Sequence, residues 1–207
     1  MLKKWILPFL IGMISLMQTT LSYAQPDIME GVEYRLIPTP QSIAPHQKQV
    51  VEIFFYGCPH CYDLEPSLHQ WLKTKPEEVH FERMPAVLDN PNWVFMARVF
   101  YTAKFLGIEK AFHARYFDAL HRDKRRIYSL DELAKFVQPL GIKADDYKNM
   151  FKSFQVSSAV SKAKQATQNF GIDGVPAVVI NGKYLTDVPM ATSREDLWRL
   201  VDILVER

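Results

Sequence analysis

The sequence VEIFFYGCPHCYDLEP, residues 51–66, contains both cysteines of this 207-residue chain, three positions apart in a CPHC motif at 58–61. The residues before the motif, 50–56, are β-branched and aromatic and are apolar on both alternating faces, apart from one acid. This pattern predicts a strand in the middle of a sheet that is covered on both sides. After the motif, apolar residues from Leu64 to Leu72 recur at helical spacing, and Pro59 suits the first position of a helix.

The segments that follow predict a crossover and then a block of helices. Residues 79–84 alternate like a second strand, so a strand–helix–strand unit with parallel pairing is expected. Asn90-Pro91 is a helix start signal, and Ser129 opens a capping box with Glu132. The expected helices cover 93–106, about 109–120, 130 to before Pro139, 144–154 and 157–170.

The β pattern returns near the C-terminus. Residues 176–180 are a short apolar run, Asn181-Gly182 is a strong hairpin signal, and residues 183–185 supply the return strand. A last amphipathic helix is capped by Ser193. Without the helical block, the order of elements is that of a thioredoxin-like fold, so we predict an α/β thioredoxin-like fold with an inserted all-helical domain. The expected divisions are a first thioredoxin-like part at 25–88, the inserted helical domain at 89–168 and a second thioredoxin-like part at 169–207.

The first 24 residues have the pattern of a secretory signal peptide. Lys3 and Lys4 precede a mostly apolar stretch, and Ser22-Tyr23-Ala24 offers a cleavage site before Gln25. A retained membrane anchor is the alternative, which the polar residues within the stretch disfavour. We therefore expect an exported, periplasmic protein of about 183 residues.

Removal of that leader changes the charge balance of the chain. The whole chain has 25 Lys and Arg against 23 Asp and Glu, and residues 1–24 contain two lysines and no acid. The exported chain would therefore be neutral, which gives no electrostatic argument for binding nucleic acid or an anionic membrane. The basic run at 121–126 is expected to be a solvated loop between helices.

Three functions can be considered for the cysteine pair. A zinc site needs about four ligands, but the chain has no second CxxC, and His69, His80, His113 and His121 are scattered and expected at the surface or at the edge of the core. A structural disulfide across four residues would remove little entropy from the unfolded chain. A redox-active pair therefore fits best, without metal or cofactor.

The predicted position of the motif also indicates the direction of electron flow. Cys58 would lie at a helix N-terminus, where unpaired backbone N–H groups stabilise a thiolate, and His60 can add positive charge. A stabilised thiolate favours the reduced form, so the disulfide would be readily passed to a substrate. The alternative for His60 is an ordinary surface residue of the turn.

Two further sites are suggested by the sequence. Glu52 lies inside the predicted central strand, where it could exchange a proton with Cys61, or it could lie near a strand end and reach water. Pro176 opens the strand at 176–180, and a cis Val175–Pro176 bond would expose the Val175 backbone to an extended substrate; an ordinary trans proline is the alternative.

The leader, VEIFFYGCPHCYDLEP and the later GVPAVVINGKY together resemble the DsbA family of exported bacterial thiol:disulfide oxidoreductases. The resemblance covers nearly the whole chain after the leader. It implies that Cys58 is the exposed nucleophile and Cys61 its buried partner, that His60 stabilises the thiolate, and that Glu52 is the buried acid of the family. Pro59 itself removes a backbone donor and rigidifies the turn of the motif. The resemblance also implies a cis proline at Pro176, with Val175 before it. Gly57 departs from members that have an aromatic residue there.

The same resemblance implies the partners. Members oxidise reduced, unfolded exported proteins and are reoxidised by the quinone-linked membrane protein DsbB. We expect a monomer. An isomerase or reductase of this fold usually carries a separate dimerisation domain, and the roughly 25 residues between the predicted cleavage point and the strand before the CPHC motif are too few for one. That isomerase or reductase, and a chaperone-like module that binds peptides without turnover, are the alternative functions.

Overall fold

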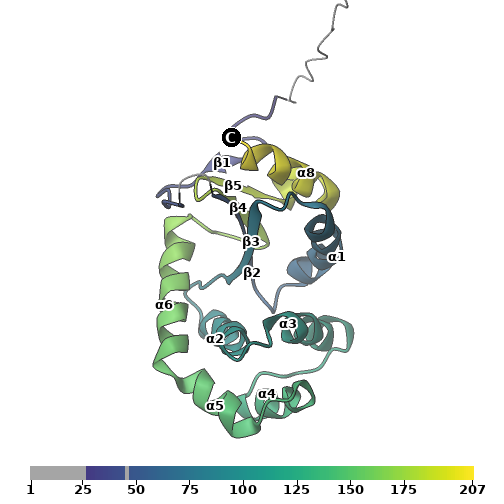
Figure 1. The fold of residues 1–207 in the computed structure, drawn as a ribbon, viewed down its shortest axis with the longest axis vertical. Helices are drawn as coiled ribbons and strands as arrows, with labels where there is room; N and C mark the ends of the chain where they lie inside the picture. The colour runs from purple at the N-terminus through teal and green to yellow at the C-terminus, as the bar shows by residue number, and fades with distance from the viewer. Residues whose placement is uncertain (1–26, 45–46) are drawn as a thin grey trace, which may run out of the picture.

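The computed structural model describes residues 27–44 and 47–207, so the predicted signal peptide lies outside the described residues. Within those two ranges, no helix combines the length and the apolar character needed to cross a membrane. The strands gather at one end of the molecule and the helices of residues 91–152, labelled α2 to α5, at the other (Figure 1).

A five-stranded mixed sheet has the order β1-β5-β4-β2-β3. Strand β2 pairs in parallel with β3, as the predicted crossover requires, and antiparallel with β4. The apolar residues of β2 and β4 contribute to cores on both faces of the sheet, because both strands lie inside it. The strands are β1 (Arg35–Leu36), β2 (Lys48–Phe54), β3 (Val79–Pro85), β4 (Ala177–Ile180) and β5 (Tyr184–Asp187).

Helices cover both faces of this sheet. One face packs against α1 and α8, whose stacked Trp71 and Trp198 have ring centroids 5.0 Å apart. The other face packs against the end of α6, around Phe170 and Ile172. The helices of this part are α1 (Pro59–Thr74), α6 (Phe154–Asn169), α7 (Val188–Ala191) and α8 (Arg194–Val205).

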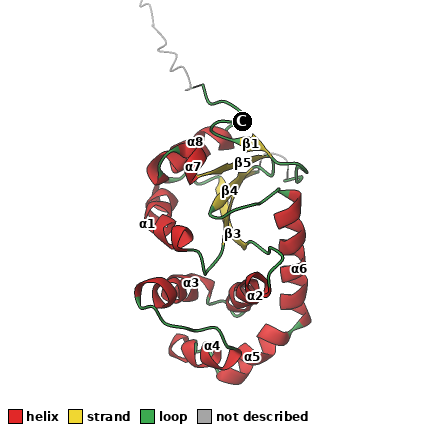
Figure 2. Cartoon of the chain, turned by 180° about the vertical axis from the view of Figure 1, so that it is seen from behind, coloured by secondary structure: helices red, strands yellow, loops and turns green. Residues whose placement is uncertain are grey.

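The helical block between β3 and β4 forms a cap with its own aromatic core. Figure 2, in which the helices are red and the strands yellow, shows its helices clustered below the strands. Phe54, Tyr56 and Cys61 belong to the same apolar cluster as the buried residues of the cap, so the cap packs directly against the segment that carries the cysteines. The cap elements are α2 (Pro91–Phe105), α3 (Glu109–Phe117), the π-helix η1 (Asp118–Arg122), α4 (Leu130–Phe136), the 3₁₀ helix η2 (Gln138–Leu140) and α5 (Ala144–Lys152).

The predicted fold class, a thioredoxin-like α/β fold with an inserted helical block, is confirmed by this arrangement. The predicted capping box at Ser129 and Glu132 is present. Asn181 and Gly182 form the hairpin turn with positive φ angles of 51° and 61°, which an Asn-Gly pair adopts with little strain.

Some boundaries differ from the sequence-based expectation. The central strand runs from Lys48 to Phe54 rather than over 50–56, because the chain turns at Tyr56 and Gly57 toward the helix. The helix expected over 109–120 ends at Phe117 and continues as a π-helix. Helix α6 begins at Phe154 rather than at 157, since the Ser153 side chain accepts a hydrogen bond from Val156 N–H and caps it.

Candidate active site

The two cysteines lie at the junction of β2 and α1. Cys58 is the N-cap of α1, with an extended backbone (φ −91°, ψ 116°), and Pro59 is the first helical residue. The Cys58 N–H donates to the carbonyl of Phe55 over 2.9 Å, which closes the turn after the strand. Cys58 is partly exposed and Cys61 is fully buried, and both are free thiols in this structure.

The environment of Cys58 favours its thiolate. A hydrogen bond from the Cys61 thiol has the largest effect, and the backbone N–H groups of Cys61 and His60 and the charge of His60 add to it. Together they lower the pKa of Cys58 from an ordinary 9.0 to about 6, although partial burial acts in the opposite direction. The thiolate is thus stabilised, as expected from the sequence, but Cys61 contributes more than the exposed imidazole of His60.

Cys61 has the opposite property. Burial raises the pKa of the Cys61 thiol far above its usual range, and the neighbouring Cys58 and Glu52 raise it further. One sulfur of the pair therefore carries negative charge at neutral pH and faces solvent, while the other stays protonated inside the protein.

A second loop lies against the motif. The Val175–Pro176 peptide bond is cis, which confirms that expectation. The Cys58 thiol donates to the Val175 carbonyl over 3.4 Å, so the loop before β4 contacts the reactive sulfur. A groove of about 330 Å³ beside this contact is lined by His60, Gly174, Val175, Pro176, Asp187, Val188, Pro189 and Arg194.

Gly57 is explained by the aromatic ring next to it. A Cβ atom on Gly57 would lie 2.5 Å from the Phe55 ring. That ring is itself stacked on Trp93 of α2, with centroids 4.0 Å apart and an interplanar angle of 19°. The small residue before Cys58 therefore makes room for an aromatic pair that belongs to the strand end and the cap.

Glu52 lies in the middle of β2 and is fully buried, so the alternative position at a strand end that reaches water is wrong. Its register partner on β3 is Arg83, and Arg83 Nε lies 3.0 Å from Glu52 Oε2. This contact lacks hydrogen-bond geometry, and no group in the described part of the chain donates a hydrogen bond to the Glu52 carboxyl group. Burial raises the pKa of Glu52 to about 8, and the charge of Arg83 opposes this only in part.

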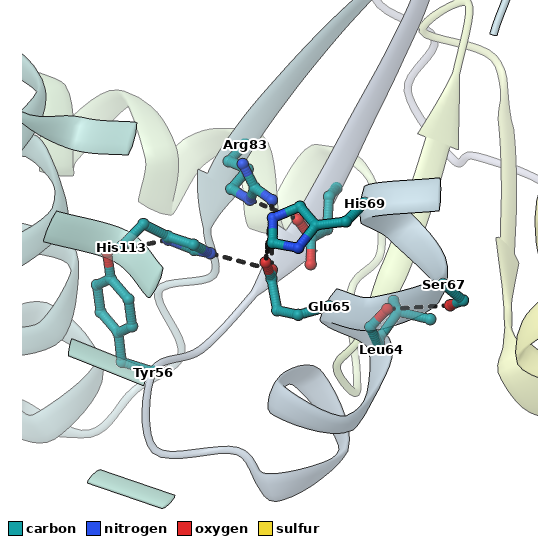
Figure 3. Close-up of polar contacts among 8 residues, drawn as sticks. Tyr56, Leu64, Glu65, Ser67, His69, Arg83 and His113 are labelled. Atoms are coloured by element: carbon teal, nitrogen blue, oxygen red, sulfur yellow. Dashed lines mark hydrogen bonds and ion pairs between the residues drawn. The ribbon is translucent and has the colours of Figure 1, made fainter. Parts of the chain in front are cut away.

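Arg83 also contacts Glu65 of α1, and Glu65 connects to the cap (Figure 3). The Arg83 guanidinium lies 3.3 Å from both Glu65 oxygens, and His113 Nε2 lies 3.0 Å from Oε1. On its other side, His113 Nδ1 lies 3.1 Å from the Tyr56 hydroxyl. The expectation that His113 is at the surface or the edge of the core is therefore wrong: it is buried, because aromatic rings of β2 and α3 surround it and both ring nitrogens have partners.

The charges in this network can be assigned from its contacts. Burial acts to raise the pKa of Glu65, but the hydrogen bond from His113 and the charge of Arg83 outweigh it, so the pKa is lowered. Burial lowers the pKa of His113, so its ring is neutral at neutral pH. Its Nε2–H then donates to Glu65 and its Nδ1 accepts from the Tyr56 hydroxyl. The positive charge of Arg83 is therefore balanced by the ionised carboxylate of Glu65, so Glu52 can remain protonated.

A family model described as DSBA-like thioredoxin domain matches residues 83–201. The thiol:disulfide interchange protein DsbA of Azotobacter vinelandii is 37% identical over 187 residues, which cover 90% of this chain and 87% of that protein. This chain belongs to the DsbA family.

Solved structures of the DsbA family support the same assignment. The crystal structure of Pseudomonas aeruginosa DsbA E82I superposes with a TM-score of 0.82 and 33% identity, covering 87% of this chain and 97% of that one. The oxidoreductase DsbA from Xylella fastidiosa gives a TM-score of 0.79 and 31% identity, with coverage of 87% and 97%. The fold of the described residues is therefore that of DsbA.

The sequence predicted the residues nearest the sulfur atoms and missed those that support them. The predicted residues nearest the sulfur atoms lie at the start of α1, which has Cys58, Pro59, His60 and Cys61. The adjoining groove is lined by His60, Val175 and Pro176. Glu65, Arg83 and His113 were not singled out as site residues. A sequence signal for two of these residues does exist. Glu65 lies among the apolar residues of a predicted helix, and Arg83 lies in the alternating pattern of a predicted strand. An ionisable residue next to buried positions needs a partner, and this could have indicated Glu65 and Arg83.

Proposed function

We propose that this chain is a periplasmic thiol:disulfide oxidoreductase that donates a Cys58–Cys61 disulfide to reduced exported proteins. The observation that carries the proposal is the contrast between the two sulfurs. Cys58 is accessible and its pKa is lowered to about 6, whereas Cys61 is buried with a raised pKa. A pair in which the exposed thiolate is stabilised favours its reduced form, and therefore oxidises other dithiols.

The reaction starts from the oxidised pair. A substrate thiolate attacks the Cys58 sulfur, the bond between Cys58 and Cys61 breaks, and Cys61 leaves with the electron pair and takes up a proton. The substrate's second thiolate then attacks the substrate sulfur of the mixed disulfide, and Cys58 departs as a thiolate. The substrate loses two electrons and two protons overall, and the cysteine pair gains the two electrons. The low pKa of Cys58 makes it the better leaving group in the second step.

Glu52 has the protonation state that this reaction needs. Because burial raises its pKa, the carboxylic acid is largely protonated at neutral pH and can supply a proton as Cys61 leaves. In reoxidation, the same group accepts that proton when Cys61 must attack. A raised pKa brings the carboxyl closer to the thiol in proton affinity, which lowers the cost of transfer in both directions.

The cis-proline loop provides the substrate-binding edge in this proposal. The Val175 carbonyl lies 3.4 Å from the Cys58 sulfur, so a substrate cysteine bonded to Cys58 would place its own backbone along Val175. Pairing of an extended, unfolded segment with this edge uses backbone groups that all substrates share. This explains how one site can accept many reduced proteins.

Sustained turnover requires a partner that reoxidises the pair. We infer a DsbB-like quinone-linked membrane protein in this role, with the chain acting as a monomer after removal of its signal peptide. Nucleic acid has no part in this function.

Two variants test the proposal against its alternatives. Cys61→Ala should accumulate mixed disulfides between Cys58 and exported proteins: the Cys58 thiolate attacks a disulfide of such a protein, the second sulfur of that disulfide leaves as a thiolate, and no Cys61 thiol is present to release the bound protein. Cys58→Ser should abolish oxidation of a dithiol peptide by the oxidised protein. If the wild-type protein protected client proteins against aggregation but did not oxidise a dithiol peptide, it would instead be a chaperone-like module.

A further inference from the structure

The helix α3 of the cap ends in a π-helical turn, Asp118–Arg122, directly beside the active-site segment. π-helical turns are rare and occur often at functional sites, because they displace side chains from the positions that an α-helix would give them. Arg122 contacts Asp118 over 2.9 Å within the turn, which braces it internally. Two other side-chain contacts reach from this turn to the residues that flank the CPHC motif.

The first of these contacts comes from His121. Its Nε2 lies 2.7 Å from the carbonyl oxygen of Tyr56, two residues before Cys58. A carbonyl oxygen only accepts, so Nε2 carries the hydrogen and donates it. The expectation of a solvated loop is thus wrong for His121, which is half-buried, whereas the following residues 122–126 are exposed.

The second contact fixes the other side of the motif. Tyr62, the residue after Cys61, donates from its hydroxyl to Asp118 over 2.9 Å. The His121 and Tyr62 rings are stacked, with centroids 5.2 Å apart and an interplanar angle of 17°. One turn of the cap therefore holds the backbone on the strand side of the motif and a side chain on its helix side.

We propose that His121 is a positioning residue for thiol–disulfide exchange, which sets the orientation of the Cys58 turn through the Tyr56 carbonyl. This inference rests on the proposed function. The Cys58 thiolate is stabilised by the backbone N–H groups of His60 and Cys61, and those groups act only if the turn from β2 is held at a fixed angle to α1. Loss of the His121 contact frees the carbonyl at the start of that turn and weakens this alignment.

Two substitutions separate the hydrogen bond from the ring. His121→Phe keeps a ring to stack on Tyr62 but has no donor, and His121→Gln keeps an N–H near the position of Nε2 but no ring. His80→Phe, at an exposed position of strand β3, is the matched control. For each variant we would measure the Cys58 pKa by thiolate absorbance and the equilibrium constant with glutathione.

We expect His121→Phe to raise the Cys58 pKa and to change the equilibrium constant with glutathione by between about two-fold and five-fold, in the less oxidising direction. The upper value, about five-fold, corresponds to the full loss of an ordinary hydrogen bond in one redox state. His121→Gln and His80→Phe should stay within two-fold of the wild type. A purely structural role would lower the thermal stability of His121→Phe and leave its pKa and equilibrium constant unchanged, which would overturn the proposal. If His121→Phe is unfolded by circular dichroism, His121→Ala replaces it with the same expectations.

The experiment distinguishes this inference from the proposed function. A wild-type protein that fails to oxidise a dithiol peptide contradicts the function itself. A wild type that is active, with His121→Phe unchanged in both redox readouts, contradicts only the role of His121.

Discussion

Replacing Cys61 by alanine should raise the pKa of Cys58, because the Cys61 thiol is the largest of the groups that lower it. A hydrogen bond to a charged group contributes about 1.5–3 kcal/mol, and the partial exposure of Cys58 places this one at the low end. Since one pKa unit corresponds to about 1.4 kcal/mol, the expected rise is about one unit from the present value of about 6. The remaining depression comes from the backbone N–H groups and the charge of His60, which this variant retains.

The measurement is the thiolate absorbance at 240 nm between pH 4 and 10, with the rate of alkylation as a second readout. Cys61→Ser is the control, because its hydroxyl can still donate to the thiolate, and it should stay closer to the wild type than Cys61→Ala does. A Cys58 pKa that stays at about 6 in Cys61→Ala would refute the reasoning. In that case the Cys58 thiolate would be stabilised mainly by the helix N-terminus and His60, as the sequence alone suggested.

Three further substitutions act on the supporting residues. Glu52→Gln should stabilise the protein at pH 8 by about 4 kcal/mol, the cost of a pKa raised from 4.5 to about 8, and have little effect at pH 4, measured by urea unfolding. The sign follows from a raised folded-state pKa: the native state binds a proton that the unfolded chain has released, so the wild type loses stability between pH 4.5 and about 8. His113→Leu should cost about 2–3 kcal/mol in the same assay, because Glu65 loses a buried donor. Gly57→Ala should cost about 1 kcal/mol, because the added Cβ forces the Phe55 ring off its stacked partner.

Matched controls are available for these variants. His80→Leu removes an exposed histidine and should change the free energy of unfolding by less than about 0.5 kcal/mol. Gly174→Ala adds a Cβ where no atom lies within 4 Å, so it should also be close to neutral. If the effect of Glu52→Gln on the free energy of unfolding did not depend on pH, the explanation by a raised carboxyl pKa would be contradicted. If His80→Leu cost as much stability as His113→Leu, or Gly174→Ala as much as Gly57→Ala, the explanation by the buried contact or by the Phe55 ring would be contradicted.

The parts of the fold that the sequence predicted are those with strong local signals. The junction of β2 and α1 combines a strand that is mostly apolar on both faces with a proline at the first helical position, and the hairpin has an Asn-Gly turn. These signals act within a few residues, so one sequence is enough to show them. The cis bond at Pro176 was predicted by resemblance alone, because a proline at the start of a strand is usually trans.

The parts that the sequence did not predict depend on contacts between distant segments. Strand β1 has two residues and pairs Arg35 with Leu185, so it has no periodicity of its own. His113 is buried because it meets Glu65 of α1 and Tyr56 after β2, which lie 48 and 57 positions away in the chain. The π-helical turn at Asp118–Arg122 likewise continues a sequence pattern that is typical of an ordinary α-helix.

The pKa contrast of the two sulfurs has the same origin. The position of Cys58 at a helix start is visible in the sequence, and it correctly predicted a stabilised thiolate. The larger contribution of Cys61 depends on the direction of its thiol and on its complete burial under the cap, which the order of residues does not reveal.

The central claim, that this cysteine pair accepts electrons from other dithiols, is tested most directly by equilibrating the protein with defined ratios of reduced and oxidised glutathione at pH 7. The stabilised Cys58 thiolate predicts that the pair stays largely reduced at ratios that leave an ordinary dithiol oxidised. A reduction potential of about −270 mV, as reducing as that of thioredoxin, would contradict the claim.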